Sequence, residues 1–495
     1  MAGELQEVPE SAPQTGKPWS GRTWTLFGLG MAALAVAAFA VTVLALSAYT
    51  PLGGAQSQPT PTAYVALAPT ATASLSPTST ATAVPTKTPT PRPTKTPTPR
   101  PTAGPKATPA TAVSTPSARL ASVMARAAAV RSLPPKEKVP IRYLSREEVG
   151  PYMRNLYEEQ YSHEDAAKDE ALFVLLGLLD EGDDLYESYL ALLGEQVVGF
   201  YEFDSHDMKL VGEPTSPTTM EELTLVHEYV HALQDQHFDM GAMAKEVEGN
   251  GEKGLGLQAL AEGDATLAMV AYAMQNLSRD EMTALQEQSG SFDSRQLDNA
   301  PPALRSTLLF PYLQGATFVA TLFQAGGWNA VNDAYSHPPQ TSEQVLHPEK
   351  YLQGEGPKEV NLPDVGAVLG SPWSVVDRDT FGELGLQMYL QDGVQAKTAT
   401  AAAAGWGGDS YVLLSDAAGR YALASLSAWD SVKDATEFFA ALRSLGGTGG
   451  AGDTHLTWSA LGKHGYASPQ GDKVLLVIAP DEATAAKIAG AFPGF

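Results

Sequence analysis

A long proline-rich segment divides this chain into parts that cannot share one core. Fifteen of the 36 prolines fall between residues 50 and 117, and the octapeptide PTKTPTPR occurs twice in tandem, at 85–92 and 93–100. Proline removes a backbone donor and fixes φ, so such a segment stays extended and semi-rigid. We therefore interpret residues 49–117 as a disordered stalk, and we expect the folded part to begin at residue 118.

An uncharged apolar run precedes the stalk. Residues 26–48 contain 23 positions without a charge, which is enough for one helix to span a bilayer. Lys17 and Arg22 precede this run, and the next charged residue is Lys87. The positive-inside rule then predicts that residues 1–25 form a cytoplasmic tail and that the rest is extracytoplasmic, in a single-pass protein of a bacterial cell membrane. A cleaved signal peptide is the alternative, although its apolar region normally has only about 7–15 residues.

Charge and cysteine content exclude several functions. The net charge is −24, which argues against nucleic-acid binding because that function needs a basic surface. The chain has no cysteine, so disulfides, thiolate ligands and a cysteine nucleophile are excluded. Any metal site must therefore use histidine and carboxylate ligands.

Residue patterns after the stalk predict an α+β fold in two parts. For residues 118–357 we expect a mostly helical domain with a small sheet. The expected helices lie near 118–133, 145–161, 163–179, 218–239, 256–275 and 301–325, the strands lie at 139–144, 195–203 and 208–212, and a proline-broken loop covers 336–351. In residues 358–495, helical stretches at 379–404 precede a β-β-α-β-α succession, which indicates a small C-terminal α+β domain.

The segment HEYVH at 227–231 is the strongest chemical signal. Thr218 and Glu221 form a capping-box pattern that predicts a helix through these residues. Positions i and i+4 share a helix face, so His227 and His231 can present both imidazoles to one ion. Zinc takes such ligands and keeps one position for water, beside which Glu228 would act as general base. Two half-buried histidines satisfied by hydrogen bonds are the alternative interpretation.

A third ligand is expected on the following helix. Glu262 interrupts an apolar helical face, where a bare carboxylate is costly to bury, and it lies 31 residues after His231. That distance leaves room for a glycine-rich loop at 249–256 and for a second helix to pack back. Asp264 is the alternative ligand, and a solvated position for Glu262 is the alternative interpretation.

These residues carry a resemblance to a known class. HExxH on one helix and a glutamate on a later helix resemble the gluzincin class of zinc metallopeptidases. The blocks GFYEF, LVHEYVHALQDQHFD, ALAEGDAT and PPQTSEQVLHPEKY resemble an uncharacterised family of membrane-anchored bacterial metallopeptidases, over roughly residues 138–420. The resemblance implies a zincin-like fold and one Zn²⁺ per chain, held by His227, His231 and Glu262, with Glu228 as base and proton shuttle.

The sequence departs from the gluzincin pattern at one position. Many gluzincins have an aspartate four residues after the ligand glutamate, where it orients the first histidine. This chain has Thr266 there, so Asp264 or Asp235 is the candidate for that supporting role.

Candidates for the remaining roles are weaker. A donor to the oxyanion is needed, and His347, Tyr351 and His337 lie on one predicted loop. The strand at 197–203 either offers its edge to an extended peptide or is simply a core strand. The glycine-rich segment at 405–411 lacks the Lys-Ser/Thr of a phosphate loop, and we predict a tight turn around a packed Trp406.

The expected function is zinc-dependent peptide hydrolysis outside the membrane. A zinc-activated water would attack the peptide carbonyl, with Glu228 as general base, and the partner would be a peptide or protein substrate. A catalytically inert zinc-binding module for cell-surface interactions is one alternative, and a stalked structural domain without metal is another. Substrate, cleavage mode and oligomeric state leave no signal in the sequence.

Overall fold

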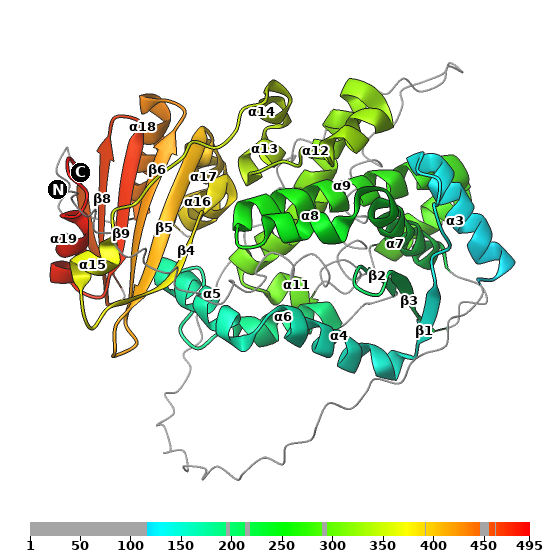
Figure 1. Ribbon diagram of the computed structural model, residues 1–495, viewed down its shortest axis with the longest axis horizontal. Coiled ribbons are helices and arrows are strands. Elements are labelled where there is room, and N and C mark those ends of the chain that lie inside the picture. The colour runs from blue at the N-terminus through cyan, green and yellow to red at the C-terminus, as the bar shows by residue number, and fades with distance from the viewer. Residues whose placement is uncertain are drawn as a thin grey trace, which may run out of the picture.

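The computed structural model describes residues 116–495, apart from 195–198, 213–217, 290–294, 392, 446–454 and 461. The predicted cytoplasmic tail and membrane helix lie outside the described residues, and so does the stalk except for its last two residues, of which Ser117 caps the first described helix. Among those described, one helix, α12 (Pro302–Ala334), is long and apolar enough to cross a membrane. Its backbone is non-helical at Gly326 and Gly327, and it packs along α9 (Gly251–Asn276) in the fold (Figure 1).

The first part is mostly helical with a small sheet, as predicted. It begins with α3 (Ala118–Arg131), β1 (Ile141–Leu144), α4 (Arg146–Gln160), α5 (His163–Leu176), α6 (Leu185–Gly194), β2 (Gly199–Glu202) and β3 (Asp207–Val211). The strands are ordered β1-β3-β2, with β1 parallel and β2 antiparallel to β3. The strands predicted at 195–203 and 208–212 therefore pair as an antiparallel hairpin from residue 199 onward, and β2 lies at an edge of this described sheet.

Capping boxes start two of the helices. Ser145 with Glu148 caps α4, and Thr218 with Glu221 caps α7 (Thr219–Phe238). In both boxes the side chain of the capping residue accepts from the third backbone N–H and the glutamate accepts from the backbone N–H of the capping residue, which confirms the box predicted for Thr218. The later helices of this part are α8 (Met240–Val247), α9, α10 (Arg279–Ser289), α11 (Arg295–Asn299), α12, α13 (Ser342–Leu346) and α14 (Pro348–Gln353).

Two predicted loops of the first part are wrong. The glycine-rich segment 249–256 is largely helical, because the Asn250 side chain caps α9 from Gly251. Gly256 is required there, since a Cβ atom would lie 2.1 Å from the carbonyl oxygen of Pro339. Residues 336–351 hold α13 and most of α14, and prolines stand at the start of α14 rather than within it.

The C-terminal part is a six-stranded antiparallel sheet with helices on both faces (Figure 1). Its elements are α15 (Val365–Leu369), β4 (Ser374–Asp379), α16 (Gly382–Gln391), α17 (Ala396–Ala403), β5 (Trp406–Ser415), β6 (Tyr421–Trp429), α18 (Val432–Leu445), β7 (Leu456–Ala460), β8 (Lys463–Gln470), β9 (Lys473–Ala479) and α19 (Glu482–Ala489). The strand order is β4-β5-β6-β9-β8-β7. The predicted β-β-α-β-α succession is present, with β4, β7 and β8 added to it.

The segment 405–411 is not a tight turn. It begins β5, which pairs with β6 through a register shift between Trp406 and Gly408. Trp406 is buried, as predicted, and its indole N–H donates to Asp409. Gly408 is needed because the backbone of Lys358 approaches to 2.2 Å from where its Cβ would lie.

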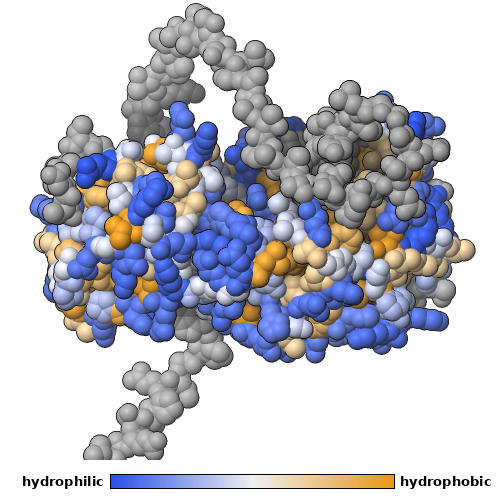
Figure 2. Space-filling view, turned by 90° about the horizontal axis from the view of Figure 1, so that it is seen from above, coloured by the Kyte–Doolittle hydropathy of each residue, from blue (hydrophilic) through white to orange (hydrophobic). Residues whose placement is uncertain are grey.

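The two parts share a hydrophobic core. Leu172, Leu175 and Leu176 of α5 belong to the same buried cluster as Trp406 and Phe438 of the C-terminal part. On the face seen in Figure 2, hydrophilic side chains predominate and hydrophobic ones lie in small separate groups. The large apolar side chains that are most exposed come from distant segments: Met274, Leu352, Val368, Val375 and Val432.

Candidate metal centre

Helix α7 brings the two histidines of the HEYVH segment to one buried position. Every residue of α7 from Glu222 to Asp235 is buried, so the helix lies inside the helical part. His227 and His231 are both 0% exposed, and their rings meet edge to face with centroids 4.7 Å apart. The one-turn spacing thus aligns two imidazole nitrogens on the same side of α7.

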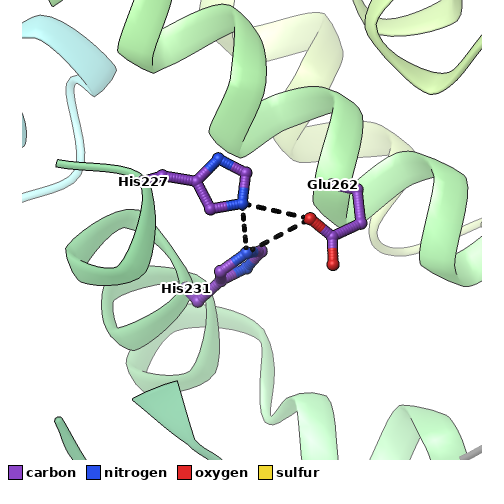
Figure 3. A group of neighbouring side chains, drawn as sticks. All are labelled: His227, His231 and Glu262. Atoms are coloured by element: carbon purple, nitrogen blue, oxygen red, sulfur yellow. Dashed lines mark hydrogen bonds and ion pairs between the residues drawn. The ribbon is translucent and has the colours of Figure 1, made fainter. Parts of the chain in front are cut away.

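Helix α9 supplies the third member of the group. Glu262 Oε2 lies 3.1 Å from His227 Nε2 and 3.5 Å from His231 Nε2, and the two nitrogens are 3.0 Å apart (Figure 3). Ligands about 2.0–2.1 Å from a tetrahedral zinc ion lie about 3.3 Å from one another. His227 Nε2, His231 Nε2 and Glu262 Oε2 thus form a triangle of the size that one such ion requires. These three buried residues, called the triangle below, are able to hold a metal.

The charges within the triangle suit a cation. Burial would raise the pKa of Glu262, but the neighbouring imidazoles hold it at about 2, so the carboxylate is ionised. Burial lowers the pKa of His227, against the opposing effect of Glu262. Burial also disfavours the charged form of His231, yet the Glu262 charge raises its pKa to about 9. A metal ion would displace that proton, because ligands bind deprotonated.

Glu228 lies beside the triangle without belonging to it. Its side chain is 0% exposed, its Oε2 accepts a hydrogen bond of 3.0 Å from the backbone N–H of Tyr201 in β2, and its Oε1 is buried without a partner. Burial raises the pKa of Glu228 to about 8. A carboxyl group with a pKa near neutrality can both take up and release a proton, as the sequence-based role requires.

The comparisons with known proteins concern the other end of the chain. Residues 372–489 match the model of DUF8575, a domain of unknown function. No curated protein and no solved structure matches the chain. The matched residues form most of the C-terminal sheet domain, so the match carries no information about the residues around His227.

Asp264, the alternative ligand, binds other side chains and not the imidazoles of the triangle. It forms a buried ion pair with Arg131 and accepts hydrogen bonds from Tyr335 Oη at 2.8 Å and Gln234 Nε2 at 3.0 Å. Gln234 in turn contacts His231 Nδ1 through its Oε1, at 2.8 Å. Asp264 therefore reaches His231 through Gln234, whereas the supporting role considered in the sequence concerned the first histidine, His227.

Asp235, the other supporting candidate, contacts Tyr201 and His206 rather than a residue of the triangle. Asp235 accepts from Tyr201 Oη and contacts His206 Nδ1, both at 2.7 Å. The hydroxyl of Thr266 is buried without a partner, and so is Nδ1 of His227. No side chain in the described structure thus takes the place of the aspartate that gluzincins have at the Thr266 position.

The predicted oxyanion donors form hydrogen bonds with residues outside the triangle. His347 Nε2 is 3.0 Å from Glu383 of α16, and Tyr351 donates to the carbonyl of His337 at 2.8 Å. Their contacts within the described residues do not include the triangle. These residues join α13 and α14 to their surroundings, and the structure does not bring them together with Glu228.

Tyr312 of α12 is a neighbour of the triangle that sequence reasoning missed. It is 1% exposed, and its ring is inclined by 26° to that of His227, with centroids 6.3 Å apart. Among the described residues its hydroxyl meets no partner at regular hydrogen-bond geometry. Burial raises the pKa of Tyr312 well above its usual range, with further contributions from the charges of Glu262 and Glu228 and from a side-chain contact of the hydroxyl with Glu262. A protonated hydroxyl therefore lies close to both carboxylates.

A cavity of about 270 Å³ adjoins this site at the end of β2. Tyr201 and Phe203 line it, and Phe203 also packs edge-on to the ring of His231, with centroids 6.2 Å apart. The remaining lining residues belong to α4, to β2 and the turn after it, and to α8: Leu156, Gln160, Glu202, Asp204, Gly241, Lys245 and Glu248.

A second carboxylate group does not need a metal. Glu343, Glu355 and Asp430 converge near one point. The ammonium of Lys350 lies among them, at 2.5 Å from Glu343 and 3.2 Å from Glu355, with Asp430 also in contact. The ammonium of Lys350 already occupies the point where these carboxylates converge and offsets part of their charge, and the group joins α13 and α14 to the C-terminal part.

Proposed function

We propose that the chain is a zinc-dependent metallopeptidase with a zincin-like catalytic domain. The observation that carries the proposal is the buried triangle of His227, His231 and Glu262, with Glu228 beside it and unpartnered on one oxygen. Two imidazoles and one carboxylate are the donor set of many catalytic zinc sites, and they leave a position free for water. When bound, zinc would acidify that water and polarise a carbonyl group.

The protein's own residues would divide the remaining work. Glu228 would take a proton from the attacking water at its free Oε1 and would later pass it to the leaving amine. Tyr312 would donate its hydroxyl hydrogen to the carbonyl oxygen as negative charge develops there. Because β2 lies at an edge of the described sheet, an extended peptide would pair alongside it once Glu228 releases the N–H of Tyr201. The proposed site is membrane-anchored and extracytoplasmic.

Complete burial favours a second function. His227, Glu228, His231 and Glu262 are at most 1% exposed, so access for a peptide requires the site to open. Structural zinc sites are closed, whereas catalytic ones keep an accessible position. A zinc-binding surface module without catalysis is therefore the alternative, and it differs from the enzyme in its dependence on Glu228.

Metal analysis together with one isosteric variant separates these functions. About one zinc per purified chain is expected, with loss of zinc in His231→Ala and Glu262→Ala. In the peptidase, Glu228→Gln would retain zinc and lose hydrolysis of a mixed peptide library. Zinc binding without hydrolysis in the unaltered protein would identify the inert module, and absence of zinc uptake would refute both functions.

A further inference from the structure

A chain of buried polar side chains extends from His231 toward the surface helices. His231 Nδ1 lies 2.8 Å from Gln234 Oε1, and Gln234 Nε2 donates to the carbonyl of Ala261 at 2.9 Å and to Asp264 Oδ2 at 3.0 Å. His231, Gln234 and Asp264 are 0% exposed. Each contact in this chain is therefore shielded from water, where an unmet hydrogen bond is costly.

The acceptors around Gln234 fix the orientation of its amide. A backbone carbonyl and an ion-paired carboxylate can only accept, so the NH₂ group must face Ala261 and Asp264. Gln234 Oε1 then faces His231 and must accept from it. Consequently Nδ1 of His231 carries a hydrogen, whether the ring is neutral or protonated, and Nε2 is the nitrogen directed at the triangle.

Arg131 of α3 holds the far end of this chain. Its guanidinium makes a two-pronged ion pair with Asp264, and one of its nitrogens donates to Asn332 at 2.7 Å. Arg131 is 0% exposed and lies over the ring of Trp328, 4.4 Å from its centroid. A buried carboxylate without such a partner would be strongly destabilised, so the two-pronged contact with Arg131 balances and orients Asp264.

We propose that Arg131 is a positioning residue for His231, acting through Asp264 and Gln234, so that Nε2 of His231 faces the metal position before an ion binds. The proposal rests on the proposed metal-binding function. It assigns to α3, the first helix after the predicted stalk, a part in preparing the site. Within the part of the chain that the structure describes, His227 has no counterpart to this support, because its Nδ1 meets no hydrogen-bond partner there.

Two variants and one matched control test the proposal in the full chain. Gln234→Leu removes the acceptor of the His231 hydrogen. The double variant Arg131→Met with Asp264→Leu removes the ion pair as a whole, because removing one partner would leave a buried charge. Thr266→Val is the control, since it alters an equally buried polar group of the same helix pair whose hydroxyl has no partner.

The first readout is the Nδ1 proton of His231 in metal-free protein labelled with ¹⁵N-histidine, assigned by its absence in His231→Ala. The second is the zinc dissociation constant, measured by competition with a chelator. We expect a slowly exchanging Nδ1 proton in the unaltered protein and in Thr266→Val, and its loss in both test variants. Zinc binding should weaken about 10–100-fold in those variants and stay within about twofold in the control.

The results separate the possible failures. An unchanged Nδ1 proton and zinc affinity in a folded double variant would overturn the role of Arg131, even if Gln234→Leu lost both. If the double variant does not fold, Arg131→Lys replaces it, since lysine keeps the charge but not the two-pronged geometry, and unchanged zinc affinity there would overturn the role equally. A protected Nδ1 proton without zinc uptake by the unaltered protein would refute the proposed function and leave the positioning intact.

Discussion

Gly263 of α9 and Gly315 of α12 meet backbone to backbone. A Cβ atom on Gly263 would lie 2.2 Å from the carbonyl of Gly315, and one on Gly315 would lie 2.2 Å from the carbonyl oxygen of Ala259. Gly263 directly follows Glu262, and Tyr312 precedes Gly315 by about one helical turn. The crossing of these helices therefore sets how closely Tyr312 approaches the triangle.

Gly263→Ala should separate the two helices and disturb the triangle. The added methyl group meets backbone, which cannot move aside as a side chain can, so we expect a loss of about 1–3 kcal/mol in the free energy of unfolding, together with weaker zinc binding. Urea unfolding and chelator competition measure both. Gly241→Ala in α8 is the control, because its Cβ would make only an ordinary contact of 3.8 Å with Asp239. Equal effects of the two substitutions would contradict this account.

Tyr312→Phe should impair catalysis without weakening zinc binding. Loss of a donor to the developing oxyanion typically lowers kcat by about 10²–10³. Stability should change little, because in the described structure the buried hydroxyl has no hydrogen bond of regular geometry and only its contact with Glu262 to lose. Steady-state kinetics on a peptide substrate and thermal unfolding give the comparison. An unchanged kcat with normal zinc content would remove Tyr312 from the mechanism.

Stability should fall as pH rises toward 8 because of Glu252. Burial raises its pKa to about 8, aided by the charges of Asp409 and Asp379 and opposed by hydrogen bonds from Ser342. The folded state therefore favours the protonated carboxyl. The resulting stability is fully present below the unfolded pKa, about 4.5, and is lost as pH rises through about 8.

Glu252→Gln tests this dependence, because the amide resembles the neutral acid at every pH. Urea unfolding at pH 5 and pH 9 should show a difference of roughly a few kcal/mol in the unaltered protein and a smaller difference in the variant. Glu246→Gln, an exposed position of α8, should leave the original dependence in place. The same slope in Glu252→Gln would assign the effect to other groups.

Leu172→Ala in α5 should destabilise the C-terminal sheet domain as well as the helical part. Leu172 is 5% exposed and lies in the cluster built around Trp406, so a cavity there should cost about 2–5 kcal/mol. Calorimetry should show one transition at a lower temperature. Two separate transitions, with the C-terminal one unshifted, would show that the shared cluster does not couple the parts.

The sequence predicted those features of the site whose chemistry is local. The capping box and the i, i+4 histidine pair each depend on residues of a single helix, so their spacing is visible in the sequence. Glu262 could be identified because a carboxylate in an apolar helix needs a partner. Tyr312 had no such signal, since a tyrosine among apolar helical residues is usually core material. The closeness of its hydroxyl to both carboxylates is visible only once α12 is packed against α9.

Parts of the fold were hidden for similar reasons. Strands β7 and β8 carry mixed, partly exposed residues at one end of the sheet, so they lack a clear apolar alternation. The glycines at 407 and 408 suggested a turn, yet they lie within β5, where the chain near Lys358 passes close to the strand. Close approach of two backbones and a tight turn both select glycine, and composition alone does not distinguish them.

The leucines that α5 contributes to the C-terminal core lie outside the residues that match the domain of unknown function. The residues that match DUF8575 begin at 372, almost two hundred positions after Leu176. A domain limited to those residues would have a sheet whose Trp406 side lacks part of its apolar cover. Folding without α5 would therefore require other apolar side chains to take the place of these leucines.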